Sequence, residues 1–170
     1  MQFKLDHNST AEEIGEFEQA AMKAGRFDLQ HLAYGLRMTT DANRIKSPLL
    51  KADRFDLAYH ALKKAVVEAK RIEERTGDSA PVMNATNTFT DYQSQYVTLS
   101  IQCIEAYHNE RLSVLRKSKS GKRQLTSTRV TLNAFAKLDG RYESGLVGSA
   151  YEKALGYWRD QEGLLASYDD

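Results

Sequence analysis

Two pairs of residues have the spacing of a metal-binding element. Asp28 lies three residues before His31, and Glu105 lies three residues before His108. Residues three apart on a helix point in similar directions, so a carboxylate and an imidazole with this spacing can share a metal ion, as in di-iron helical bundles. The chemistry of such a site would be carboxylate-bridged metal binding.

The sequence nevertheless favours coincidence over a metal site. A complete site would need two further carboxylates on neighbouring helices, such as Glu16 and Glu68. With 23 acidic residues in the chain, two of its four histidines have an acid three places earlier roughly one time in ten by chance, and short motifs often match in this way. We therefore expect His108 to be a hydrogen-bonded core histidine and the chain to hold no metal and no other cofactor.

No residue is placed for nucleophilic catalysis. Cys103 is the only cysteine, and its position between Leu99 and Ile104 favours a small core side chain over a reactive thiol. No serine has the Gly-x-Ser-x-Gly setting of a hydrolase nucleophile. Gly121 and Lys122 lack the earlier glycine and the following Ser or Thr of a phosphate-binding loop. We therefore expect no catalytic residues and a protein that is not an enzyme.

The strongest functional signal is a run of basic residues on a segment rich in serine and glycine. The run consists of Arg116, Lys117, Lys119, Lys122 and Arg123. Small residues disfavour a helix here, so we expect a basic flexible loop over 118–125. Such a loop can contact phosphates, although no aromatic residue within the run could stack on bases. Three interpretations remain open: a nucleic-acid contact, a contact with an acidic protein patch, and a solvated loop without a partner.

Charge is distributed unevenly along the chain. The 24 Lys and Arg nearly balance the 23 Asp and Glu. The segment 111–138 nevertheless holds eight basic residues and no acidic one, which leaves 16 basic and 23 acidic side chains elsewhere. One positive segment therefore belongs to an otherwise acidic chain, and a neighbouring copy is one possible acidic partner.

Small residues recur at helical spacing near the C-terminus, within about 80° of one another on a helix. The set consists of Gly145, Gly148, Gly156, Gly163 and Ala166. A glycine costs about 1 kcal/mol relative to alanine inside a helix, which suggests that something approaches the backbone closely. One interpretation is close packing inside the domain, or a helix break near Gly156. The other is a self-association surface whose register is set by Arg159 with Asp160 or Glu152.

The elements that must position these residues are helices, and the central one is expected over 87–117. Its apolar residues form two adjacent stripes that together span roughly 220°, whereas a helix with one exposed face needs little more than 100°. One stripe contains Phe89, Tyr92, Tyr96, Leu99 and Cys103, and the other contains Val97, Ile101, Ile104, Leu112 and Leu115. We therefore expect this helix to be buried on at least two sides, with a narrow polar edge.

Capping signals place two helices before residue 47. A capping box, in which a hydroxyl and a carboxylate satisfy each other's backbone amides, is available at Thr10 with Glu13 or one residue earlier. Gly25 can end this first helix in the left-handed conformation. Asp28 can cap a short second helix, and the lack of periodicity over 39–46 predicts a loop.

Three more segments follow. Ser47 and Pro48 predict the start of a helix that runs to Thr76 and ends at Gly77, because proline is favoured at the first helical position. A connector is expected over 78–86. The segment 124–138 fits either a helix or a strand, and we favour the helix because no other strand is available for pairing. A last helix is expected over 145–168, with Trp158 on its buried face.

These patterns predict an all-α, single-domain bundle over residues 1–170, with five or six helices around 87–117. The predicted role is a non-enzymatic binding, adaptor or assembly protein that self-associates through its C-terminal helix and contacts an anionic partner through the basic loop. A nucleic-acid-binding accessory protein is the first alternative, and a carboxylate/histidine metal-binding bundle is the second. The single cysteine, the lack of an apolar leader at the N-terminus and the lack of a membrane span predict a cytoplasmic protein, or part of a particle assembled there.

Overall fold

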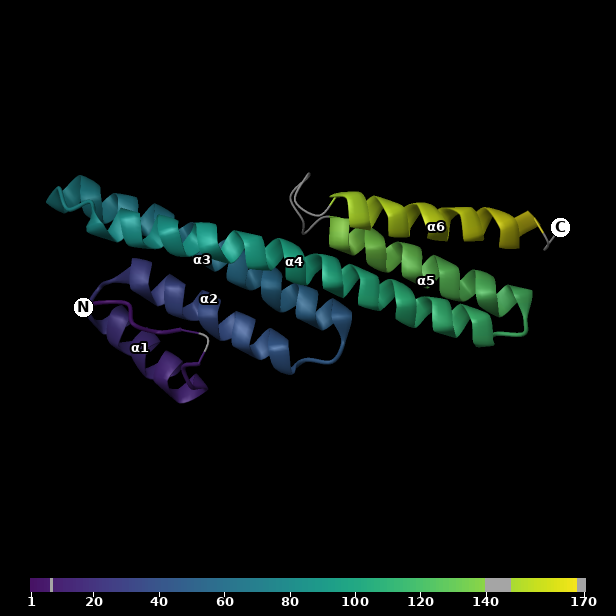
Figure 1. The fold of residues 1–170 in the computed structure, drawn as a ribbon, viewed down its shortest axis with the longest axis horizontal. Helices are drawn as coiled ribbons and strands as arrows, with labels where there is room; N and C mark the ends of the chain where they lie inside the picture. Colours follow the sequence, from purple (N-terminus) through teal and green to yellow (C-terminus); the bar gives the residue numbers. More distant parts are fainter. Residues whose placement is uncertain (7, 140–147, 168–170) are drawn as a thin grey trace. The chain divides into compact units, whose positions relative to one another are not determined.

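The computed structural model describes residues 1–6, 8–139 and 148–167. Within these residues the chain forms six helices and no strand, which confirms the all-α prediction (Figure 1). The helices are α1 (Ala11–Lys23), α2 (Phe27–Arg44), α3 (Pro48–Thr76), α4 (Ala80–Lys117), α5 (Gly121–Asp139) and α6 (Gly148–Ser167). The segment 124–138 is therefore helical, as favoured.

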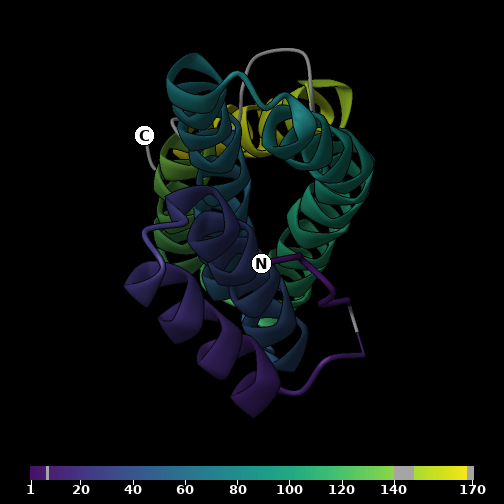
Figure 2. The same ribbon diagram turned by 90° about the vertical axis from the view of Figure 1, so that its left-hand side faces the viewer.

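Backbone contacts group the chain into two compact units, Met1–Tyr96 and Val97–Asp170, where the sequence predicts one domain. Helix α4 contributes its first part to one unit and its second part to the other. In the first unit, α1 packs along α2, and α2 packs along α3 (Figure 2). In the second unit, α5 and α6 pack against each other.

The ends of α1 and α3 follow the capping chemistry read from the sequence. The hydroxyl oxygen of Thr10 accepts a hydrogen bond from the backbone N–H of Glu13 at 3.1 Å, which is one half of the expected capping box, and the hydroxyl itself donates to the Glu13 carboxylate at 3.1 Å. Gly25 and Gly77 follow the two helices with φ of +69° and +75°, a conformation that favours glycine. The predicted bounds of α3, from Pro48 to Thr76, are confirmed.

Helix α2 is longer than predicted, and the loop expected over 39–46 is wrong for its first six residues. Met38 and Ala42 are buried and continue the apolar stripe of the helix by one more turn. The hydroxyls of Thr39 and Thr40 donate to carbonyls one turn earlier, so these threonines satisfy their polar groups inside the helix. Asp28 was expected as the cap, but the cap position is Arg26 and Asp28 lies in the first turn.

Helix α4 also begins earlier than predicted, at Ala80 rather than at Asn87, so the connector expected over 78–86 is wrong from residue 80 onward. The Asp78 carboxylate accepts a hydrogen bond from the backbone N–H of Ala80 at 3.0 Å. Pro81 lies in the first turn, where its missing N–H removes no helical hydrogen bond. A capping carboxylate and a proline together start the helix before its apolar stripes begin.

The core of the first unit combines small residues with stacked aromatic rings. Buried alanines on α3 keep this helix narrow, and a Cβ atom added at Gly35 would lie 3.1 Å from the Leu62 side chain. The Tyr59 ring stacks on Tyr96 at a centroid distance of 4.6 Å and contacts Phe89 at 5.5 Å. This unit therefore depends on close helix packing around one aromatic cluster.

The core of the second unit is centred on three fully buried side chains, Ile104, Phe135 and Trp158. The Tyr151 hydroxyl donates a hydrogen bond to the Phe135 carbonyl oxygen at 2.8 Å, and Tyr107 contacts the Phe135 ring edge-on. Cys103 is buried, as predicted.

The two apolar stripes of α4 are buried unequally. Leu99 on the first stripe is only half-buried, as are Val97, Ile101 and Leu112 on the second. Ile104 is fully buried. The expected burial on two sides therefore holds for only part of the helix.

We predict that Ile104→Ala lowers the free energy of unfolding by about 2–5 kcal/mol, the range for removing a large buried side chain. Leu99→Ala should cost clearly less because Leu99 retains solvent contact. Urea denaturation of both variants measures the difference. Equal costs, or a negligible cost at Ile104, would contradict the burial described here.

Candidate functional site

The five predicted basic residues lie together where α4 gives way to α5. Arg116 and Lys117 end α4, Lys119 lies between the helices, and Lys122 and Arg123 belong to the first turn of α5. All five side chains are exposed. We call this group the basic turn.

The segment between α4 and α5 is shorter than the flexible loop predicted over 118–125, and side-chain hydrogen bonds hold its backbone. Only residues 118–120 separate the two helices, because α5 begins at Gly121. The side-chain amide of Gln124 donates to the carbonyl oxygens of Ser118 at 2.7 Å and Leu115 at 3.4 Å. These bonds cap the end of α4 from the start of α5, and they fix the backbone that carries the cations.

The helix dipoles make the start of α5 attractive to an anion. Basic residues at the end of α4 are favourable, since the C-terminus of a helix carries partial negative charge. Lys122 and Arg123 are at the opposite kind of helix end, where the partial charge is already positive and the first turn has no acidic residue. Their charges are opposed by the dipole, typically by about 0.3–1 kcal/mol each, until an anion binds.

Basic residues that the sequence prediction left out of the site extend along α5. Lys122, Arg129 and Lys137 are seven and eight residues apart and therefore lie on one side of the helix, where all three are exposed. The row covers about 22 Å at 1.5 Å per residue. Arg129 forms a solvent-exposed ion pair with Glu162 at 3.3 Å. The helical spacing of Arg129 and Lys137 would have placed them in this row from the sequence alone, if 124–138 had been predicted only as a helix and not also as a strand.

The glycine face of α6, defined by Gly156 and Gly163, is open. Both residues are exposed, and a Cβ atom added at either would meet nothing within 4 Å. The helix continues through both, so neither the close internal packing nor the break near Gly156 is found here. Arg159 is exposed on the same helix. Gly145 lies outside the described residues, and only the backbone of Gly148 is described, at the start of α6.

The predicted metal-binding residues are not assembled into a site. Asp28 is buried, and the Arg26 guanidinium holds both of its carboxylate oxygens at 2.8–2.9 Å. Burial and the charge of Lys64 lower the pKa of His31. Glu105 is exposed, and the described residues contain no group of three potential ligands.

His108 has a structural partner, as the sequence predicts. Its Nδ1 accepts a hydrogen bond from the indole Nε1–H of Trp158 at 2.8 Å. The ring also contacts Tyr157 edge-on at a centroid distance of 5.2 Å. Partial burial and the nearby charge of Lys153 lower the pKa of the imidazole, so His108 is neutral at neutral pH.

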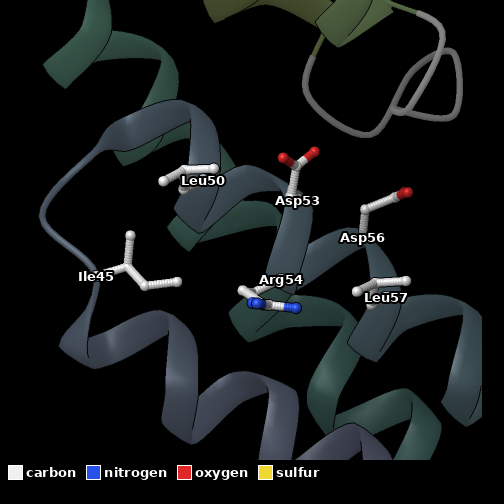
Figure 3. Close-up of a pocket in the computed structure, with 6 residues that line it drawn as sticks. All are labelled: Ile45, Leu50, Asp53, Arg54, Asp56 and Leu57. Atoms are coloured by element: carbon white, nitrogen blue, oxygen red, sulfur yellow. The ribbon is translucent and has the colours of Figure 1, made fainter.

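Two clefts complete the candidate surfaces. The first, of about 370 Å³, lies in the first unit at the turn from α2 to α3. Its apolar wall is formed by Ile45, Leu50 and Leu57, and Figure 3 shows the carboxylates of Asp53 and Asp56 on the side away from Ile45. Asp56 lies 3.3 Å from His60 of the same helix.

The second cleft, of about 330 Å³, lies between α4 and α6 in the second unit. Of its residues, the sequence analysis considered only Glu105 and His108 as site candidates, as part of a metal site that it judged a coincidence. The remaining lining residues come mostly from α6, and only packing of the two helices brings them together.

No protein-family model, curated protein or solved structure matches this chain at a significant level. In the part of the chain that the structure describes, none of the helices is both long and apolar enough to span a bilayer. The candidate functional surfaces of the chain are the basic turn, the glycine face of α6 and the α4–α6 cleft.

We predict that the stability of the protein falls as the pH is lowered below the ordinary histidine value of 6.5. The pKa values of His31 and His108 are lowered in the folded state, so the unfolded chain binds more protons between the folded and unfolded values, and stability is lost over that window. Urea denaturation at several pH values measures this loss.

Single substitutions separate the contributions of His31 and His108 to the pH dependence of stability. His31→Gln should remove one share of the pH dependence and His108→Gln the other. A pH dependence that persists in the double variant at positions 31 and 108 would contradict this assignment.

Proposed function

We propose that this chain is a non-enzymatic helical assembly protein. It binds an anionic partner through the basic turn and self-associates through the glycine face of α6. The observation that carries this proposal is the placement of five exposed cations around the start of α5, where a helix dipole and the absence of acidic residues favour an anion.

The arrangement of the basic turn supports binding in preference to a purely solubilising role. A solubilising loop needs charge but no fixed backbone, whereas Gln124 caps α4 and holds this turn in one conformation. The cations start from a preorganised backbone, so less ordering opposes binding. The acidic remainder of the chain makes a neighbouring copy one suitable partner.

The glycine face supports self-association. Two glycines weaken α6, yet their exposed positions do not serve packing within the described residues of the chain. A helix of another copy could approach this backbone more closely than it could approach larger side chains. The exposed Arg159 can set the register of such a contact.

A nucleic-acid-binding accessory protein is the second candidate function. The row formed by Lys122, Arg129 and Lys137 favours it, because an extended line of charge suits a polymer with regularly spaced phosphates. Such binding would have little sequence specificity, since contacts to phosphates position a protein without reading bases.

We predict that binding through the basic turn depends strongly on salt. If all five cations contact phosphates of duplex DNA, log affinity should fall with log salt at a slope of roughly −4 to −5. Replacing all five by glutamine should remove most of this slope. Titrations with a random duplex, an RNA strand and polyglutamate compare the possible anionic partners.

A charge-matched variant provides the control. It replaces five exposed basic residues of α3 by glutamine, namely Arg54, Lys64, Lys70, Arg71 and Arg75. This variant should bind like the parent chain. Absence of binding to all three polyanions at low salt would contradict an anionic partner, and equal binding by the basic-turn variant would exclude this surface.

We predict that Gly156→Leu and Gly163→Leu reduce the oligomeric mass while the helix content is retained, because each added side chain blocks backbone approach without entering the core. Sedimentation measures the mass, and Trp158 fluorescence monitors packing. Gly15→Leu on α1 is the matched control, since a Cβ atom there also meets nothing within 4 Å. An unchanged mass in both α6 variants, or a monomeric parent, would contradict the proposed surface.

A further inference from the structure

The cleft between α4 and α6 is lined by several side chains that carry hydrogen-bond donors. Its lining residues are Ile104, Glu105, His108 and Asn109 from α4, and Lys153, Ala154 and Tyr157 from α6. Ile104 and Ala154 are buried and form an apolar base, whereas the polar residues are partly or fully exposed. The cleft therefore combines an apolar base with a polar rim, as small-ligand sites do.

The hydrogen bond from Trp158 determines which nitrogen of His108 can donate a hydrogen bond to a ligand. Because Nδ1 accepts from the indole N–H at 2.8 Å, it carries no proton, and the neutral imidazole bears its hydrogen on Nε2. Trp158 is fully buried, so the imidazole is anchored from the core. The Nε2–H has no partner among the described residues and is a donor available to a ligand.

Lys153 supplies a positive charge close to this donor. Within the described part of the chain its ammonium group has no carboxylate at ion-pair distance. The side-chain amide of Asn109 adds a third donor to the same cleft. Glu105 contributes the only negative charge among the lining residues.

We propose that this cleft binds a carboxylate carried on a small apolar group. The ammonium of Lys153 and the Nε2–H of His108 hold the carboxylate oxygens, while Ile104, Ala154 and the Tyr157 ring contact the apolar group. One cation beside two neutral donors, with Glu105 nearby, suits a monoanion better than a phosphate dianion. Binding at this cleft requires neither the basic turn nor self-association through the glycine face.

The test uses the full chain and benzoate as the probe. Trp158 is the only tryptophan, so its fluorescence reports on the surroundings of the indole, which include the hydrogen bond to His108. At constant ionic strength, benzoate should change this fluorescence saturably, with acetate weaker and neutral benzamide without effect. N-acetylphenylalanine, which has the carboxylate of a peptide C-terminus, distinguishes that source from a free aromatic acid.

Two substitutions on the rim should act in opposite directions. Lys153→Gln should weaken benzoate binding about tenfold, the effect of losing one hydrogen bond to a charged group. Glu105→Gln should strengthen it about twofold to fivefold, since it removes a repulsive charge at an exposed position. Both residues are exposed, and circular dichroism should show unchanged helix content.

The proposal is overturned by any of three results. These are the absence of saturation up to roughly 50 mM benzoate, where binding is too weak to matter, equal binding of benzamide, and unchanged affinity in the folded Lys153→Gln variant. Phosphate that binds more tightly than benzoate would also contradict the monoanion assignment.

Discussion

The second unit depends on one polar requirement, which is that the buried indole N–H of Trp158 must find an acceptor. An unpaired N–H in a core typically costs about 1–3 kcal/mol. His108 satisfies it, and only its neutral form can do so. The same bond joins α6 to α4, so the packing of the largest core side chain and the protonation state of a cleft residue are linked. Lys153 helps to keep the imidazole neutral, and it belongs to the cleft as well.

The basic and acidic residues involved in the proposed function are separated along the chain. The basic turn concentrates charge at a point where a helix start already favours anions, whereas all 23 acidic residues lie outside 111–138. Elsewhere in the chain, carboxylates form ion pairs with nearby cations, such as Asp28 with Arg26 and Glu18 with Arg37. The cations of the basic turn have no such partner within the described residues. Charge that is not used for folding is the charge most available for binding.

The sequence correctly predicted the ends of α1 and α3, which are set by capping groups or proline within a few residues. Thr10 with Glu13 marked the start of α1, and Pro48 and Gly77 marked α3, because capping groups and proline act over a few residues. The extensions of α2 and α4 were missed, since small and polar residues such as Thr39 and Ala85 are buried only when another helix covers them. The α4–α6 cleft was missed for the same reason. Whether a glycine is crowded, as at Gly35, or open, as at Gly156, depends on neighbours distant in sequence.

The two exposed glycines of α6 also bear on the order of events during synthesis and folding. A 20-residue helix with Gly156 and Gly163 in its interior is too weak to form alone, because each glycine costs about 1 kcal/mol relative to alanine. The burial of Tyr151, Ala154 and Trp158 against the rest of the unit must therefore stabilise it. A flat helical face at these glycines exists only after the chain has folded. Nascent or unfolded copies would lack the surface, so any association through it would be restricted to completed molecules.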